Sequence, residues 1–252
     1  MVRFIHRMLI GLLLASHVLS ASVRIYQLRG DIRIRHGLEE VWYPAGIGMD
    51  LEQMDSIFSG EASEVVLILE DGNRFTLGSN AVLDISDLRR ITERQLFLYL
   101  MSQKVEKLNI PEPASKIHIA NVSVVRGAQK GGVSHEEGTA DPLQWKLEIN
   151  GAKALLSAAY YPNAIMKFYK ILEHYPSLED QGDIHYHLGQ AFEALEENGR
   201  ACDAYQTALE RMESTGSSSN LRDRSMRIQE ALKRLKSDSS MNEQGGLNDS
   251  SP

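Results

Sequence analysis

A continuous apolar segment followed by an alternating apolar and polar segment predicts a β-hairpin in the first third of the chain. Residues 65–69 form a continuous apolar run, and Phe75 and Leu77 then alternate with polar residues. Asp71-Gly72 lies between the two segments and supplies the positive φ that a tight primed turn requires. We therefore expect two antiparallel strands joined by a tight turn.

A second alternation upstream predicts another strand with one buried face. Ile32 and Ile34 alternate with Arg33 and Arg35, which places the isoleucines on a core face and the guanidinium groups in water. Glycines then recur at intervals that leave room only for short strands, at Gly30, Gly46, Gly48, Gly60, Gly72 and Gly78. This pattern favours an all-β sandwich or roll.

From about Asp141 the period changes to that of a helix. Asp141 is an N-cap acid followed by Pro142 at the first helical position and Gln144 three residues after the cap. Helical periodicity continues to Met212, with small and large residues spaced as in crossing antiparallel helices. The clearest set is Leu188, Gly189, Phe192, Ala201, Tyr205 and Ala208.

The β-rich segment resembles the FecR domain of bacterial envelope proteins. The resemblance is carried by the order of residues 30–35, Pro44, Gly48, residues 55–60, Ser63, residues 67–72 and Leu77, with weaker elements at 113–114 and 124–128. It covers about Val23 to Ala128 and implies an all-β module. After Gly127 the chain continues with Gln129-Lys130-Gly131-Gly132, so the module is expected to be shortened at its C-terminal edge.

The helical segment resembles the tetratricopeptide repeat (TPR). A weaker earlier copy, with Ala164 and Phe168 in its second helix, is offset by 37 residues from the clear copy at Ala201. Two such repeats bury too little apolar surface alone. A further helix over 221–235, with an apolar stripe, would close the stack; docking on the β module or self-association would serve equally.

The N-terminus has the layout of a secretory signal peptide. Arg3 and Arg7 precede the apolar segment 8–15, small residues follow near Ala21, and the segment is too short to span a membrane. We therefore expect a periplasmic protein without a transmembrane segment in its mature form. The predicted parts are a signal peptide (1–21), a FecR-like β domain (22–128), a linker (129–140), a TPR-like domain (141–235) and a disordered tail (236–252).

Charge and candidate chemistry argue against several function classes. The net charge of −7 disfavours nucleic acid as a partner. His185 and His187 are two apart on a helix and point to different faces, which disfavours a metal site near Asp183. Cys202 lies beside Asp203 in a helix, where an inert packed thiol is expected. We therefore predict no catalytic residues, no cofactor and no metal.

The predicted binding surface is the concave side of the repeats, where first helices present their side chains. By analogy with TPR geometry these are Lys146, Lys153, Tyr186, Gln190 and Glu193. The expected function is that of a non-enzymatic envelope scaffold or sensor that binds envelope proteins through the helical repeats. Two alternatives remain: a FecR-type regulator of transmembrane signalling, and a protein that binds peptidoglycan or the cell wall through its β domain.

Overall fold

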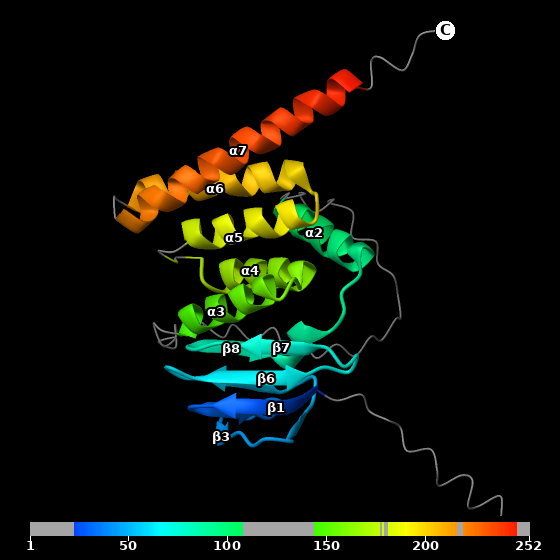
Figure 1. The fold of residues 1–252 in the computed structure, drawn as a ribbon, viewed down its shortest axis with the longest axis vertical. Coiled ribbons are helices and arrows are strands. Elements are labelled where there is room, and N and C mark those ends of the chain that lie inside the picture. The colour runs from blue at the N-terminus through cyan, green and yellow to red at the C-terminus, as the bar shows by residue number, and fades with distance from the viewer. Residues whose placement is uncertain (1–22, 108–143, 177, 179–180, 216–218, 246–252) are drawn as a thin grey trace, which may run out of the picture. The chain divides into compact units, whose positions relative to one another are not determined.

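The structure, a computed structural model, describes residues 23–107, 144–176, 178, 181–215 and 219–245. Strands come first in the chain and helices follow (Figure 1). The chain divides into two compact units, one of residues 1–79 with 84–86 and the other of residues 80–83 with 87–252. The expected order of a β-rich part before an α-helical part is thus confirmed.

The strands are short and form two four-stranded sheets; all of them lie in the β-rich unit except β8, of which residues 81–83 are assigned to the helical unit. One sheet has the order β4-β1-β6-β7 and the other has the order β3-β2-β5-β8. Their core is formed by fully buried side chains that include Ile25, Ile34, Ile57, Leu67 and Phe75. The strands are β1 (Val23–Arg29), β2 (Ile32–Arg35), β3 (Tyr43–Pro44), β4 (Asp50–Leu51), β5 (Ser56–Ser59), β6 (Glu64–Ile68), β7 (Arg74–Leu77) and β8 (Ala81–Asp84).

The predicted hairpin is confirmed, but its turn differs from the expected one. β6 and β7 pair antiparallel, with Val65 opposite Leu77. The amide of Leu69 donates to the Asn73 carbonyl at 2.8 Å and the amide of Gly72 donates to the Leu69 carbonyl at 2.9 Å. Only Gly72 has a positive φ, of 81°, within this turn. The loop therefore has three residues, with a type I turn followed by a left-handed glycine, and is not a two-residue primed turn.

One helix lies inside the range that the sequence analysis assigns to the all-β module. α2 (Glu93–Lys107) begins after a capping box, in which the Gln95 amide donates to the Thr92 hydroxyl at 3.3 Å and the Gln95 side chain accepts from the Thr92 amide at 2.9 Å. Leu96 and Leu100, four residues apart, are buried on one face of the helix. The expectation of uninterrupted β structure up to residue 128 was therefore wrong for this segment.

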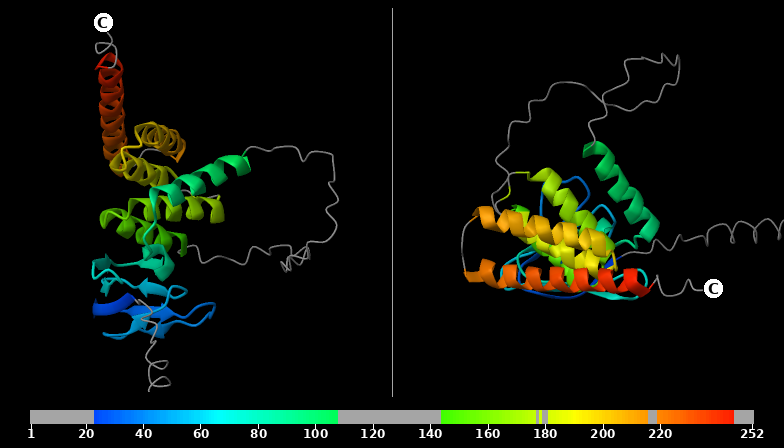
Figure 2. Two further views of the ribbon diagram at one scale, coloured as in Figure 1. Left: turned by 90° about the vertical axis from the view of Figure 1, so that its right-hand side faces the viewer. Right: turned by 90° about the horizontal axis from the view of Figure 1, so that it is seen from above.

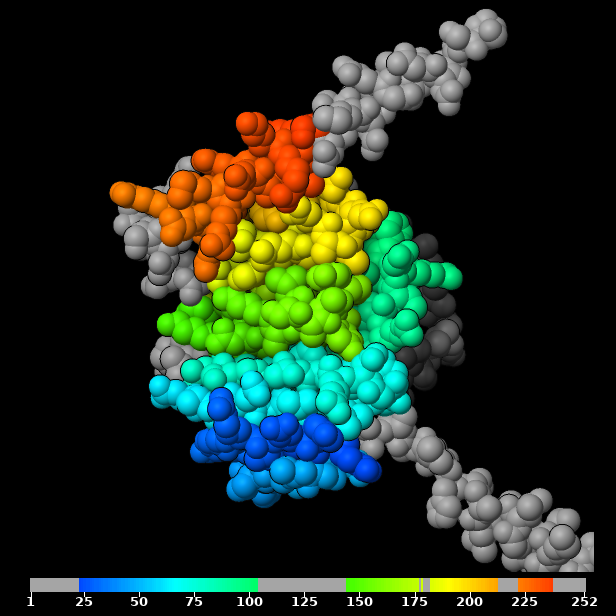
Figure 3. Space-filling model, viewed as in Figure 1, coloured from blue at the N-terminus to red at the C-terminus, as the bar shows by residue number. Residues whose placement is uncertain are grey.

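The remaining helices form an array of hairpins in successive layers (Figure 2). α3 packs on α4, α4 on α5, α5 on α6 and α6 on α7, while α2 packs on α4. In the space-filling view these layers of helices follow one another closely on the face shown (Figure 3). The helices are α3 (Gln144–Ser157), α4 (Tyr161–His174), α5 (Gln181–Ala194), α6 (Asn198–Thr215) and α7 (Ser219–Gly245), and a short 3-10 helix, η1 (Ile85–Leu88), follows β8.

Small residues allow these helices to approach closely, as their spacing predicts. A Cβ atom added at Gly189 of α5 would lie 2.5 Å from ring carbons of Tyr205 in α6. A Cβ atom at Gly151 of α3 would lie 2.1 Å from the carbonyl oxygen of Val82 in the same unit. Glycine at these positions therefore sets the distance at which the neighbouring elements pack.

The last helix is longer than the sequence predicts. Ile228, Leu232 and Leu235 are buried, which confirms the apolar stripe that closes the array; the side chain of Leu221 is outside the described part. The helix continues to Gly245, so residues 236–245 are helical and do not belong to a disordered tail. This segment contains no proline, and the helix ends where two glycines follow each other, at 245 and 246.

Several predictions fall on residues outside the described ranges. They concern the signal peptide (1–21), the later FecR-like elements and the linker (108–140), the helix start at Asp141-Pro142, and the end of the tail (246–252). Along the ranges that are described, no helix has both the length and the apolar character needed to cross a membrane.

Candidate functional site

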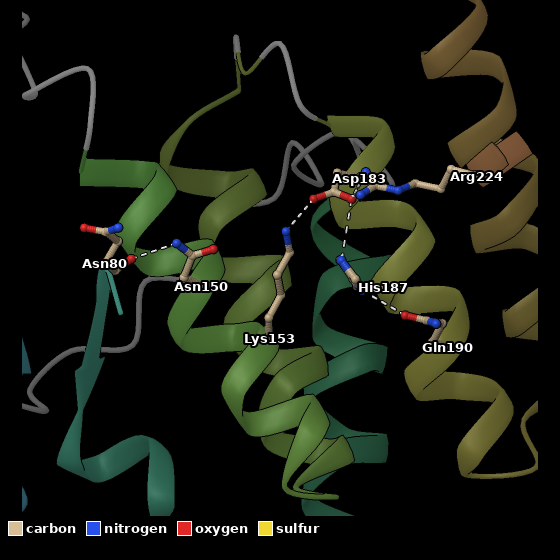
Figure 4. Close-up of polar contacts among 7 residues, drawn as sticks. All are labelled: Asn80, Asn150, Lys153, Asp183, His187, Gln190 and Arg224. Carbon is tan, nitrogen blue, oxygen red and sulfur yellow. Dashed lines mark hydrogen bonds and ion pairs between the residues drawn. The ribbon is translucent and has the colours of Figure 1, made fainter. Parts of the chain in front are cut away.

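Three helices of the array contribute to one polar cluster, which we call the Asp183 cluster: Lys153 of α3, Asp183, His187 and Gln190 of α5, and Arg224 of α7 (Figure 4). Nζ of Lys153 lies 2.7 Å from Oδ2 of Asp183, and the Arg224 guanidinium pairs with Oδ1. The Asp183 side chain is 13% exposed, so this largely buried carboxylate has two cationic partners from two other helices.

His187 lies one turn after Asp183 and is held by stacking and by a hydrogen bond. Its ring is nearly parallel to that of Phe168 in α4, with the ring centroids 5.9 Å apart. Its Nδ1 lies 2.8 Å from Oε1 of Gln190, and because an amide oxygen only accepts, Nδ1 is the donor. Nε2 lies 3.5 Å from Oδ1 of Asp183, too far for a strong hydrogen bond.

The protonation of the pair follows from burial and from the neighbouring charges. Burial lowers the pKa of His187 below its ordinary value and outweighs the attraction of Asp183, while Lys153 and Arg224 oppose a further positive charge. Burial alone would raise the pKa of Asp183, but His187, Lys153 and Arg224 together hold it below its ordinary value. At neutral pH the cluster therefore contains an ionised Asp183 and a neutral His187.

A second polar contact joins α5 to both α6 and α7. The hydroxyl of Tyr205 donates to Oε2 of Glu193 at 2.8 Å, and Arg234 pairs with Oε1 of the same carboxylate. Arg234 and Glu193 are 41 residues apart in the sequence, as are Arg224 and Asp183. The two ion pairs have the same sequence separation, and the later residue of α5 pairs with the later residue of α7. The two helices therefore run in the same direction along this face.

The five predicted binding residues all lie on α3 or α5, and four of them have partners within the unit. Lys153 and Glu193 form the ion pairs described above. Tyr186 is 9% exposed, accepts from Nε2 of Gln190 at 3.1 Å, and has the Arg224 guanidinium 5.7 Å from its ring centroid. Lys146 is exposed, with Nζ 5.1 Å from the ring centroid of Trp145. The structure therefore brings Lys153, Tyr186 and Gln190 into one network of contacts around Asp183, while Glu193 belongs to the second polar contact.

Asp183, His187 and Arg224 are the residues of this network that the sequence analysis did not select for binding. The i, i+4 spacing of Asp183 and His187 shows in the sequence that they share a helix face. The contacts of Asp183 with Lys153 and Arg224 depend on how separate helices align, and a single sequence does not show that alignment. The sequence pattern predicted the helix over 221–235 only as a closing helix, without a contact to Asp183.

Other reactive groups in the described residues have inert surroundings. Burial raises the pKa of the Cys202 thiol and outweighs the opposite effect of Lys236, while Asp203 and Glu193 act in the same direction as burial. That thiol is therefore protonated at neutral pH and a poor nucleophile. Within the described ranges, no three His, Cys, Asp or Glu side chains are grouped so that they could hold a metal ion.

Comparisons with models of protein families, with curated proteins and with solved structures gave no match for this chain.

Proposed function

We propose that this protein is a non-enzymatic scaffold of the bacterial cell envelope, which combines a FecR-like β domain with a TPR-like helical domain and binds another envelope protein. The observation that supports it best is the Asp183 cluster, in which three helices fix polar side chains on one face of the helical unit. A surface whose side chains are already held loses little conformational entropy when a partner binds.

The partner is expected to lie along α3 and α5 and to carry an acidic segment. Lys146 is exposed, while Lys153 and Arg224 are each about one third exposed beside their shared carboxylate. The exposed sides of these three cations favour an anionic partner, and Tyr186 and Gln190 lie next to them. Export to the periplasm, expected from the N-terminal segment, places such a partner among the envelope proteins.

Site-specific crosslinking in intact cells tests this proposal. A photoreactive amino acid at Lys146 should capture a protein partner, because this side chain is exposed on α3, two turns before Lys153. The matched control carries the same amino acid at Gln206, an exposed position of α6. A Lys153→Ala exchange in the Lys146 variant should weaken the capture.

Binding at this face, its absence and binding to the cell wall predict different results. Equal capture from Lys146 and Gln206, or no capture from either, would contradict binding at this face. Co-sedimentation of the purified protein with sacculi, without any captured protein, would instead favour the cell-wall alternative.

A further inference from the structure

Exposed apolar side chains are concentrated in one part of the β-rich unit. Among the described residues, ten large hydrophobic side chains are exposed, and six of them lie between residues 38 and 54. We call these six the loop patch: Leu38 (92% exposed), Val41, Tyr43, Ile47 (70%), Met49 and Met54 (65%). Such concentrations on soluble proteins mark surfaces that are covered by a partner, whereas isolated exposed hydrophobic residues do not.

The loops that carry the patch are tied down by hydrogen bonds. The buried carboxylate of Asp55 accepts from the amides of Gly37 at 3.3 Å and Glu52 at 2.9 Å, which joins the loop after β2 to the loop after β4. The amide of Gly48 donates to the Ile25 carbonyl at 2.8 Å, and the Ile25 amide donates to Met49 at 2.9 Å. The patch is therefore a preformed surface and needs little ordering before a partner binds.

A partner would bind this surface through side chains and not by adding a strand. The two strands beside the patch, β3 and β4, have only two residues each. Pro44 in β3 lacks an amide hydrogen, which protects a sheet edge against further pairing.

The segment that carries the patch is acidic and therefore favours a cationic partner, although Arg24 pairs with Asp50 and the Arg35 guanidinium lies 5.1 Å from the ring centroid of Trp42. From Gly37 to Asn73 the chain has no Lys or Arg, and Glu39, Glu40 and Glu52 are exposed on the loops that carry the patch. The acidic residues of this stretch are Glu39, Glu40, Asp50, Glu52, Asp55, Glu61, Glu64, Glu70 and Asp71. An apolar surface with an acidic rim fits a partner that presents an apolar side chain among Lys and Arg.

The outer face of α7 has this composition. Arg222, Met226, Lys233 and Lys236 are spaced so that they share the face opposite the buried stripe, and we call them the cationic stripe. Met226 is 60% exposed, with Arg222 one turn before it and Lys233 two turns after it. Asp223 and Glu230 are exposed beside this stripe, but from residue 222 to residue 236 the helix has six Lys and Arg residues against these two acidic ones.

We propose that the loop patch of one copy of this protein binds the cationic stripe of a second copy. The two surfaces are complementary in charge, each has exposed apolar atoms, and both are present in every molecule of the protein. Because the two surfaces differ, the contact is heterologous, and repeated contacts build a ring or an open chain. This inference goes beyond the proposed function and uses a different face of the helical unit, so either can fail alone.

Sedimentation velocity of the purified mature protein tests self-association. Over about a hundredfold range of protein concentration, the weight-average sedimentation coefficient should rise with concentration. The association should weaken about tenfold or more between about 50 mM and about 500 mM salt, because exposed charges contribute to it. A sedimentation coefficient that corresponds to a monomer at every concentration would overturn the proposal.

Charge exchange then tests the two surfaces. One variant carries Glu39→Lys, Glu40→Lys and Glu52→Lys, and the other carries Arg222→Glu, Lys233→Glu and Lys236→Glu. Each alone presents two surfaces of like charge and should associate at least about tenfold more weakly than the wild-type protein. An equimolar mixture of the two should associate again, since each reversed surface then meets a surface of opposite charge.

Two controls complete the experiment. Glu173→Lys with Glu210→Lys changes exposed acidic residues of α4 and α6 and should leave the association unchanged. Circular dichroism must show that each variant is folded. If the two variants associate like the wild-type protein, or if their mixture stays monomeric, the assignment of these surfaces is wrong.

Discussion

At the scale of single residues, His187 is expected to make the stability of the helical unit depend on pH. Its folded-state pKa lies below the ordinary value because the ring is buried, so the folded state binds the proton less readily than the unfolded chain. The contribution of neutral His187 is therefore complete above the unfolded-state pKa of about 6.5 and declines as the pH falls below it.

The measurement is urea unfolding, followed by circular dichroism, between pH 7.5 and pH 5 in steps of about half a unit. The loss of unfolding free energy toward low pH should be smaller in His187→Gln, which has no titratable ring. His174→Gln, a change at an exposed position at the end of α4, is the control and should keep the wild-type dependence. An unchanged dependence in His187→Gln would show that other groups cause it.

Gly189 of α5 lies where the packing against α6 leaves no room for a side chain. A Cβ atom would lie 2.5 Å from ring carbons of Tyr205, which is 2% exposed and held by its hydrogen bond to Glu193. The burial of Tyr205 and the contact with Glu193 also raise the pKa of its hydroxyl, so the hydrogen bond persists over the ordinary pH range. The ring therefore has little freedom to move away.

Gly189→Ala should lower the free energy of unfolding by about 1–3 kcal/mol, because the added methyl group overpacks the contact between α5 and α6. Gly199→Ala is the matched control, since a Cβ atom there meets no atom within 4 Å. It should be neutral or stabilise the protein by up to about 1 kcal/mol. Urea unfolding of both variants checks this, and equal effects would contradict the packing argument.

At the scale of secondary-structure elements, local patterns predicted the strands β2, β6 and β7 and the helices after residue 141, but neither the other strands nor the ends of the elements. Alternation at Ile32 and Ile34 and the apolar run before Gly72 correctly predicted strands, because burial of one face enforces those patterns. The helix α2 was missed, although Thr92 and Gln95 form a capping box, because the family resemblance favoured β structure there. The resemblance outweighed a local signal that was correct.

The closing role of α7 leads to a prediction at this scale. Ile228 is fully buried on the face that packs toward α6, whereas Met226, two residues earlier on the same helix, is 60% exposed. Ile228→Ala should lower the unfolding free energy by about 2–5 kcal/mol, because a cavity replaces the side chain. Met226→Ala should change it by no more than about 0.5 kcal/mol. Similar losses for both variants would mean that α7 does not close the array by apolar packing.

At the scale of the whole molecule, the sequence predicted two modules, but the compact units of the structure divide at other residues. The predicted linker, 129–140, is outside the described ranges, whereas residues 80–83 and the described segment 87–107 belong to the same unit as α3 to α7. Asn150 donates to the Asn80 carbonyl at 2.7 Å, and Asn163 donates to the carbonyls of Asp87 at 2.7 Å and Arg89 at 2.8 Å. These contacts join residues about 70 or more positions apart, and no local pattern reveals them.

The same contacts predict that a helical fragment starting at the sequence-derived boundary lacks part of its core. The side chains of Lys167 and Asp87 form an ion pair at 2.8 Å and are 5% and 9% exposed, and α2 buries Leu96 and Leu100 in the same unit. A fragment of residues 87–245 should therefore have a higher melting temperature than a fragment of residues 141–245. Each 1 kcal/mol of added stability corresponds to about 4–8 °C in a domain of about 100 residues and to about 2–4 °C in one of about 150 residues.

Thermal unfolding followed by circular dichroism compares the two fragments. The matched control is Asn163→Ala in both fragments, since Asn163 is buried and its carbonyl partners are present only in the longer one. The exchange should cost the longer fragment about 1–3 kcal/mol, because buried carbonyl groups lose their donor, and should cost the shorter fragment less. If the fragments melt together and respond equally to Asn163→Ala, residues 87–107 do not contribute to the helical unit, and the boundary near residue 141 is adequate.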